Sequence, residues 1–146
     1  MKRFLHPPVR SPFRWAAALT LLVTAGTHIP LIPEHLEEAP YVGALFIALS
    51  LVSSILAVAV VVRDVPAVWA ISGTVTLLAL VAFLVSRTVG LPQIGDDIGN
   101  WTEPLGYPAL AAELATVVLA GLVIGRGPTG AAGTTRSRLP LPGAGR

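Results

Sequence analysis

The chain alternates four long apolar stretches with short polar segments. Each stretch has about the length, roughly 20 residues, that an α-helix needs to cross a bilayer. The stretches cover residues 15–33, 41–62, 65–86 and 107–125. This pattern predicts an all-α fold, a polytopic membrane protein whose residues 15–125 form a four-transmembrane-helix bundle.

The polar segments between the stretches predict how the helices are connected. Only Arg63 and Asp64 separate the second stretch from the third, so these two stretches form an antiparallel helical hairpin. The longer connections, 34–40 and 87–106, lie together at the other end of the bundle. Residues 1–14 form a basic N-terminal segment, and residues 126–146, rich in Gly, Pro, Ser and Thr, have the composition of a disordered tail.

Composition narrows the class of protein. A chain of 146 residues has room for one domain, and its hydrophobic share of 53% fits an integral membrane protein rather than a soluble one. The lack of cysteine excludes thiolate metal sites, so any metal must bind through His, Asp or Glu. The basic residues flank apolar stretches instead of forming a patch with interleaved aromatics. We therefore expect the lipid bilayer, and no nucleic acid, as a partner.

Charge predicts the orientation of the bundle. Nine of the ten Lys and Arg residues lie on the side of the termini, and Arg87 alone lies on the other side. The positive-inside rule then places both termini in the cytoplasm and the two longer connections outside. Six of the eight acidic residues fall on the outer side, which agrees with this orientation.

Three titratable residues at the outer ends of the stretches are the first candidates for a functional site. At 1.5 Å per residue, His28 lies roughly 7 Å below Pro33, and Glu113 lies roughly 9 Å below Tyr107, so the two side chains share one depth. A carboxylate in hydrocarbon is costly unless it is protonated or paired. We expect Glu113 to face the bundle interior with His28 or Arg87 as its partner. The alternatives are a structural hydrogen bond for His28 and outward snorkelling for Arg87.

The first outer connection carries candidate metal ligands. His35 and Glu38 are three residues apart, which places them on one face of a helical turn, and with His28 they provide the nitrogen and oxygen ligands of a divalent metal site. Glu103 in the second connection adds a carboxylate to the ligand-binding set of Arg87 and Glu113, and Asp96 and Asp97 lie nearby. The alternative is that the acids only cap the helices and fix the topology.

Three segments carry a resemblance to a known group of proteins. These segments are HIPLIPEHLEEAPYVGALF at 28–46, SRTVGLP at 86–92 and WTEPLG at 101–106. In them the chain resembles a family of uncharacterised small bacterial four-span integral membrane proteins, over roughly residues 15–125. The resemblance implies the same architecture and a multi-pass location in the bacterial inner (plasma) membrane, and it implies no activity.

Three classes of function are open on these residues. The first is a cation- or ligand-binding accessory protein, and the second is a structural subunit that docks to a larger membrane complex or to a second copy through small-residue faces such as Gly121-xxx-Gly125. The third, an enzyme, has the least support, because the chain lacks a G-x-S-x-G elbow, a glycine-rich phosphate loop and a recognised set of catalytic ligands. The binding protein is the favoured interpretation.

Overall fold

The computed structural model describes residue 9 and residues 11–126, and these residues form an all-α bundle. The first helical segment comprises α1 (Arg14–His28), the 3₁₀ turn η2 (Ile29–Leu31) and α2 (Ile32–Glu38). It is followed by α3 (Pro40–Arg63), α4 (Pro66–Thr88), the 3₁₀ turn η3 (Gly95–Asp97) and α5 (Gly106–Gly125). The prediction of four long helices is confirmed. Most of the basic lead and of the predicted disordered tail lies outside the described residues.

Four helical segments are long and apolar enough to cross a membrane. Many of their large apolar side chains are exposed on the surface of the bundle, including Leu19, Leu51, Val58 and Val118, each at least half exposed. In a bundle of this composition, such side chains face lipid rather than water. The chain is therefore a multi-pass membrane protein.

Prolines mark where the helices begin. Pro40 and Pro66 are the first residues of α3 and α4, where a missing N–H costs no intrahelical hydrogen bond. Pro30 and Pro33 occupy the same kind of position in η2 and α2. Because Pro30 and Pro33 fall in first turns, the first helical segment continues beyond its predicted end at residue 33 and reaches Glu38.

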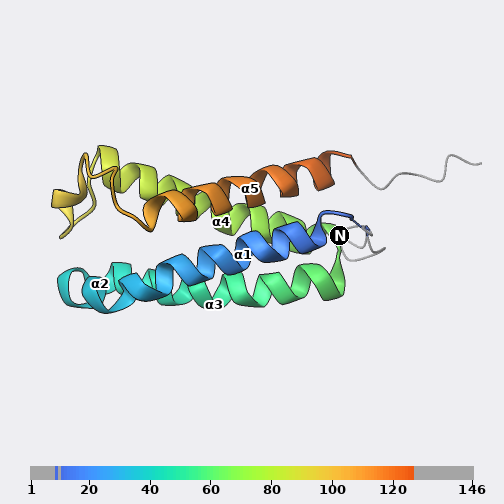
Figure 1. The fold of residues 1–146 in the computed structure, drawn as a ribbon, viewed down its shortest axis with the longest axis horizontal. Coiled ribbons are helices and arrows are strands. Elements are labelled where there is room, and N and C mark those ends of the chain that lie inside the picture. Colours follow the sequence, from blue (N-terminus) through green and yellow to red (C-terminus); the bar gives the residue numbers. More distant parts are fainter. Residues whose placement is uncertain (1–8, 10, 127–146) are drawn as a thin grey trace, which may run out of the picture.

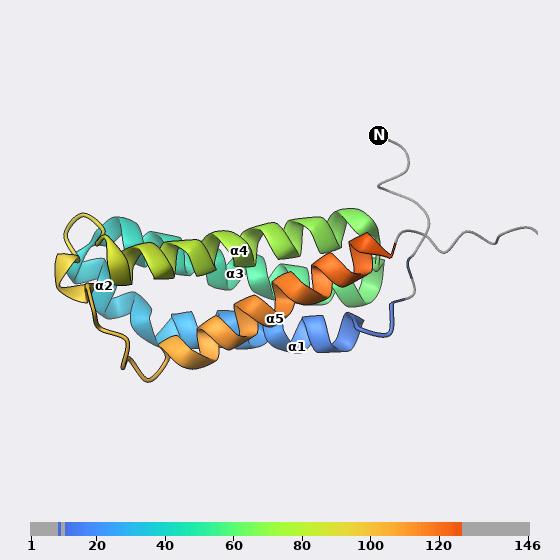
Figure 2. The ribbon, with the colours of Figure 1, turned by 90° about the horizontal axis from the view of Figure 1, so that it is seen from above.

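The long helices run antiparallel to their neighbours in a ring (Figures 1 and 2). Helix α1 packs against α3 and α5, and α5 packs against α4. The two helices of the hairpin, α3 and α4, meet at their Arg63–Pro66 turn and then separate (Figure 1). We call the end with this turn and the start of α1 the terminal end, and the end with α2 and η3 the loop end.

Apolar side chains fill the terminal half of the bundle. The cluster combines small residues with Leu21, Val60 and Trp69, all fully buried. Asp64 ties this end together, because its carboxylate accepts hydrogen bonds from the Trp69 indole N–H (2.7 Å) and the Ser11 backbone N–H (2.6 Å). The Asp64 carbonyl also accepts the Val9 backbone N–H at 2.7 Å. The sequence alone showed Asp64 only as a charged turn residue.

Small and hydroxyl-bearing residues let the helices approach closely in the middle of the bundle. One face of α5 carries small residues and is buried, with Ala109, Thr116 and Ala120 all turned inward. The hydroxyls of Thr116 and Thr20 are 2.8 Å apart and join α5 to α1. Ser50 on α3 donates to the Ala25 carbonyl of α1 at 3.2 Å. These bonds hold α1 between its two neighbours.

Candidate functional site

A cavity of about 460 Å³ lies between α3 and α4 in the loop half of the bundle. It exists because α3 and α4 separate towards this end. Its walls are mostly aliphatic, with Leu45, Leu49 and Val52 from α3 and Leu78 and Ala79 from α4. Pockets of this size and lining are typical of small-molecule sites. The predicted polar residues lie around its loop end.

Polar side chains from several elements line this end of the cavity. Its polar lining comprises His28, His35, Ser86, Arg87, Asp97 and Glu103. These residues come from α1, α2, α4, η3 and the connection before α5. Residues distant in the sequence thus converge where an apolar cavity ends, which is the arrangement of a binding site with an apolar body and a polar head.

Arg87 is the centre of this polar end. Its side chain is only 4% exposed and forms ion pairs with Asp97 and Glu103. Its guanidinium carbon also lies 4.9 Å from the centre of the Phe83 ring. The expectation that Arg87 is a candidate partner of Glu113 is corrected, because loop carboxylates pair with it instead. Outward snorkelling is also excluded by this burial.

The pairing with Arg87 orders the second connection. The backbone adds to it, since the Gly99 N–H donates to the Arg87 carbonyl at 2.9 Å. Glu103, predicted as a ligand-binding residue, therefore lines the cavity while holding the arginine. Asp97 is a site residue that the sequence placed only near Glu103 in the second connection. The neighbouring Asp96 is exposed. The two aspartates are adjacent in the sequence, which offered no signal that distinguished the site residue from the exposed one.

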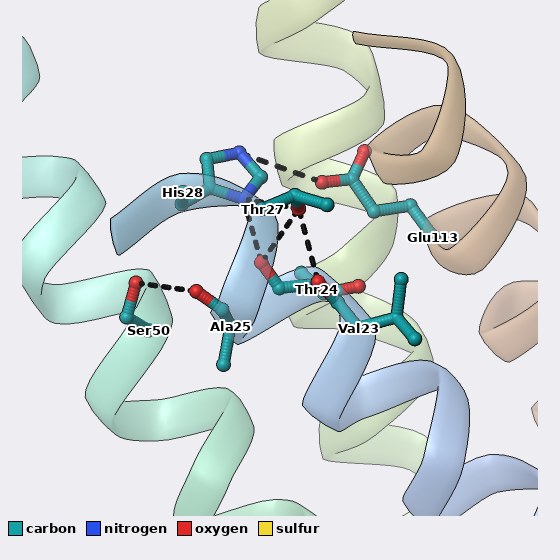
Figure 3. A network of polar contacts seen from close by, with 7 residues as sticks. All are labelled: Val23, Thr24, Ala25, Thr27, His28, Ser50 and Glu113. Carbon is teal, nitrogen blue, oxygen red and sulfur yellow. Dashed lines mark hydrogen bonds and ion pairs between the residues drawn. The ribbon is translucent and has the colours of Figure 1, made fainter. Parts of the chain in front are cut away.

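His28 and Glu113 meet, as the depth calculation predicted (Figure 3). The His28 Nε2 and Glu113 Oε1 atoms are 3.8 Å apart, too far for a strong hydrogen bond but close enough for a charge interaction. His28 Nδ1 donates to the Thr24 carbonyl at 2.8 Å, which fixes the ring and leaves Nε2 towards the carboxylate. Glu113 is 2% exposed and belongs to the bundle interior, whereas His28 also lines the cavity. His28 therefore lies between the cavity and the interior of the bundle.

His28 and His35 flank one aromatic ring. Their ring centroids lie 5.0 Å and 4.8 Å from that of Phe46 on α3. His35 Nδ1 donates to the Leu31 carbonyl at 2.9 Å, so both imidazoles are fixed by the backbone of their own helical segment. Phe46 is a residue whose position in the site the sequence did not predict.

The predicted metal ligands are only partly brought together. Glu38 is exposed at the end of α2, and its neighbours Glu34 and Glu37 are exposed as well. Among the residues that the structure describes, no three His, Asp or Glu side chains are grouped to hold a metal ion. A divalent metal bound by His28, His35 and Glu38 stays a prediction without geometric support.

Comparisons with known proteins leave the site to be interpreted from its own chemistry. The chain was compared with protein-family models, with curated proteins and with solved structures. None of the three comparisons found a match.

Proposed function

We propose that this chain is a small membrane-embedded ligand-binding accessory protein. The observation that supports this function is the cavity between α3 and α4, whose aliphatic walls end at Arg87, Asp97 and Glu103. A buried ion-pair cluster contributes little net stability in place of apolar packing. Its position at the polar end of a cavity therefore favours a role in binding. The His28–Glu113 pair extends the polar site into the bundle.

We further propose that the protein lies in the bacterial inner membrane with both termini in the cytoplasm. The support is the charge distribution, because nine of ten basic residues lie on the side of the termini. The loop end, and with it the polar end of the cavity, then faces outward. A ligand arriving from the cell exterior or from the bilayer has access to it.

Cysteine labelling tests this orientation. The chain has no native cysteine, so Glu37→Cys, Gln93→Cys and Ser137→Cys each introduce a single thiol. We expect an impermeant thiol reagent added to intact cells to label the first two variants and not the third. All three should react after the cells are permeabilised. Labelling of Ser137→Cys in intact cells contradicts the orientation.

Native mass spectrometry tests the binding function. We expect the full chain, extracted from its membrane in mild detergent, to carry a discrete extra mass of small-molecule size. The variant Ala79→Phe fills the cavity and should lose that mass. Ala111→Phe makes the same change on an exposed position of α5 outside the cavity and should keep it.

Two other results would contradict the binding of a small organic molecule. A chain without bound small molecule, purified with a stoichiometric protein partner, favours the structural subunit instead. About one metal ion per chain, lost in both His28→Ala and His35→Ala, favours the predicted metal site. Metal analysis of the same preparation measures this.

A further inference from the structure

The cavity opens sideways, towards the lipid. Leu45 and Val52 on α3 and Leu78 on α4 line it, and they are 60%, 36% and 64% exposed, so the cavity is open at these positions. These positions belong to helices that cross the membrane. The opening between α3 and α4 therefore faces hydrocarbon. An occupant entering by this route has an apolar chain.

The polar end of the cavity has an uncompensated negative charge. Arg87 supplies one positive charge and faces two carboxylates, Asp97 and Glu103, which are only 22% and 21% exposed. The remaining acids of the loop end, including Glu34 and Asp96, add to the negative potential. One arginine cannot neutralise two partly buried carboxylates, and the remaining charge is costly. A cationic group on the occupant would balance it.

The same end also contains an unpaired hydrogen-bond donor. The Arg87 Nε–H is buried and has no acceptor among the described residues. A buried donor left unpaired is destabilising, because it has lost its hydrogen bonds to water. Arg87 lines the cavity, so its guanidinium is the cation there that an oxygen of the occupant can contact. His35, whose Nδ1 is engaged by Leu31, keeps Nε2 as an acceptor when its ring is neutral.

We infer that the cavity binds a zwitterionic phospholipid of the bilayer with a primary ammonium in its head group. The ammonium lies against Asp97 and Glu103, a phosphate or ester oxygen lies against the Arg87 guanidinium, and one acyl chain lies between α3 and α4. An anionic lipid supplies no cation to the two carboxylates and adds a further negative charge to this end. This inference rests on the proposed binding function and names its ligand class. The cavity volume suits one acyl chain, while the second acyl chain stays in the bilayer.

Competition between two lipids tests this assignment. The full chain is reconstituted in bilayer discs of equal parts phosphatidylethanolamine and phosphatidylglycerol, and the lipid retained after gentle release is measured by native mass spectrometry. We expect phosphatidylethanolamine to be retained about tenfold over phosphatidylglycerol. Glu103→Gln removes one carboxylate while Asp97 still holds Arg87. We expect this variant to reduce the preference to about threefold or less. A tenfold preference corresponds to only about 1.4 kcal/mol, so the loss of one charge interaction is enough to remove most of it.

The controls separate this inference from the binding function itself. Ala79→Phe should retain neither lipid, and Ala111→Phe should behave like the parent. Equal retention of the two lipids, or a preference that Glu103→Gln leaves unchanged, overturns the lipid assignment. So does free phosphoethanolamine that competes as well as the intact lipid, because the ligand is then a soluble head group. If the parent retains no molecule from the discs or from its native membrane, the proposed function fails as well.

Discussion

Trp69→Ala is expected to lower the free energy of unfolding by about 3–5 kcal/mol, the usual cost of deleting a large buried aromatic side chain. Trp69 is fully buried in the apolar cluster of the terminal half. Its indole N–H also donates to Asp64 at 2.7 Å, so the deletion leaves a cavity and removes a partner of a buried carboxylate. Unfolding in mixed detergent, followed by circular dichroism, measures the change.

Two variants divide this effect into its causes. Trp69→Phe keeps most of the volume and loses the donor, so we expect a smaller loss of about 1–3 kcal/mol. Trp101→Ala is the matched control, because Trp101 is 43% exposed in the second connection and should cost about 1 kcal/mol or less. If Trp69→Ala is as stable as Trp101→Ala, the terminal half is not the stabilising core described above.

The second large effect concerns the pair formed by His28 and Glu113. We expect Glu113→Leu to cost about 1–3 kcal/mol of unfolding free energy, because it leaves the fixed His28 Nε2 without its partner. Glu113→Gln should be milder, since the amide keeps hydrogen-bonding groups at the same place. The same detergent unfolding assay measures both variants.

A double-mutant cycle shows whether the two side chains interact. We expect His28→Leu and Glu113→Leu together to cost less than the sum of the single variants, with a coupling of about 0.5–2 kcal/mol, as for polar pairs between membrane helices. Single variants whose costs add within about 0.3 kcal/mol would mean that the 3.8 Å approach carries no energy. Glu113→Leu as stable as the parent would mean the same.

Hydropathy and helix geometry predicted the bundle and one contact of the site. The four long apolar runs identify the helices because the membrane allows few other structures. The meeting of His28 and Glu113 was predictable because a straight helix converts sequence separation into depth. Depth alone, however, does not say which side chains at one level face each other. Arg87 was therefore expected as a candidate partner of Glu113, whereas it pairs with Asp97 and Glu103.

The cavity and the terminal core were not predictable, for different reasons. The aliphatic residues that line the cavity have the same pattern as buried core or lipid-facing residues, so only the separation of α3 from α4 distinguishes them. Asp97 and Asp96 are adjacent in the sequence, and the fold of the connection decides which one reaches Arg87. Asp64 is a turn residue by sequence, and its role comes from Trp69 and Ser11, which pack against it.

The tie formed by Asp64 has a consequence for the direction from which a lipid arrives. It fixes the α3–α4 hairpin at the terminal end, next to the buried Trp69, so the two helices separate only towards the loop end. The opening therefore borders one leaflet of the bilayer. In a membrane whose two leaflets differ in lipid composition, the proposed lipid site samples only that leaflet, which is the outer one in the proposed orientation.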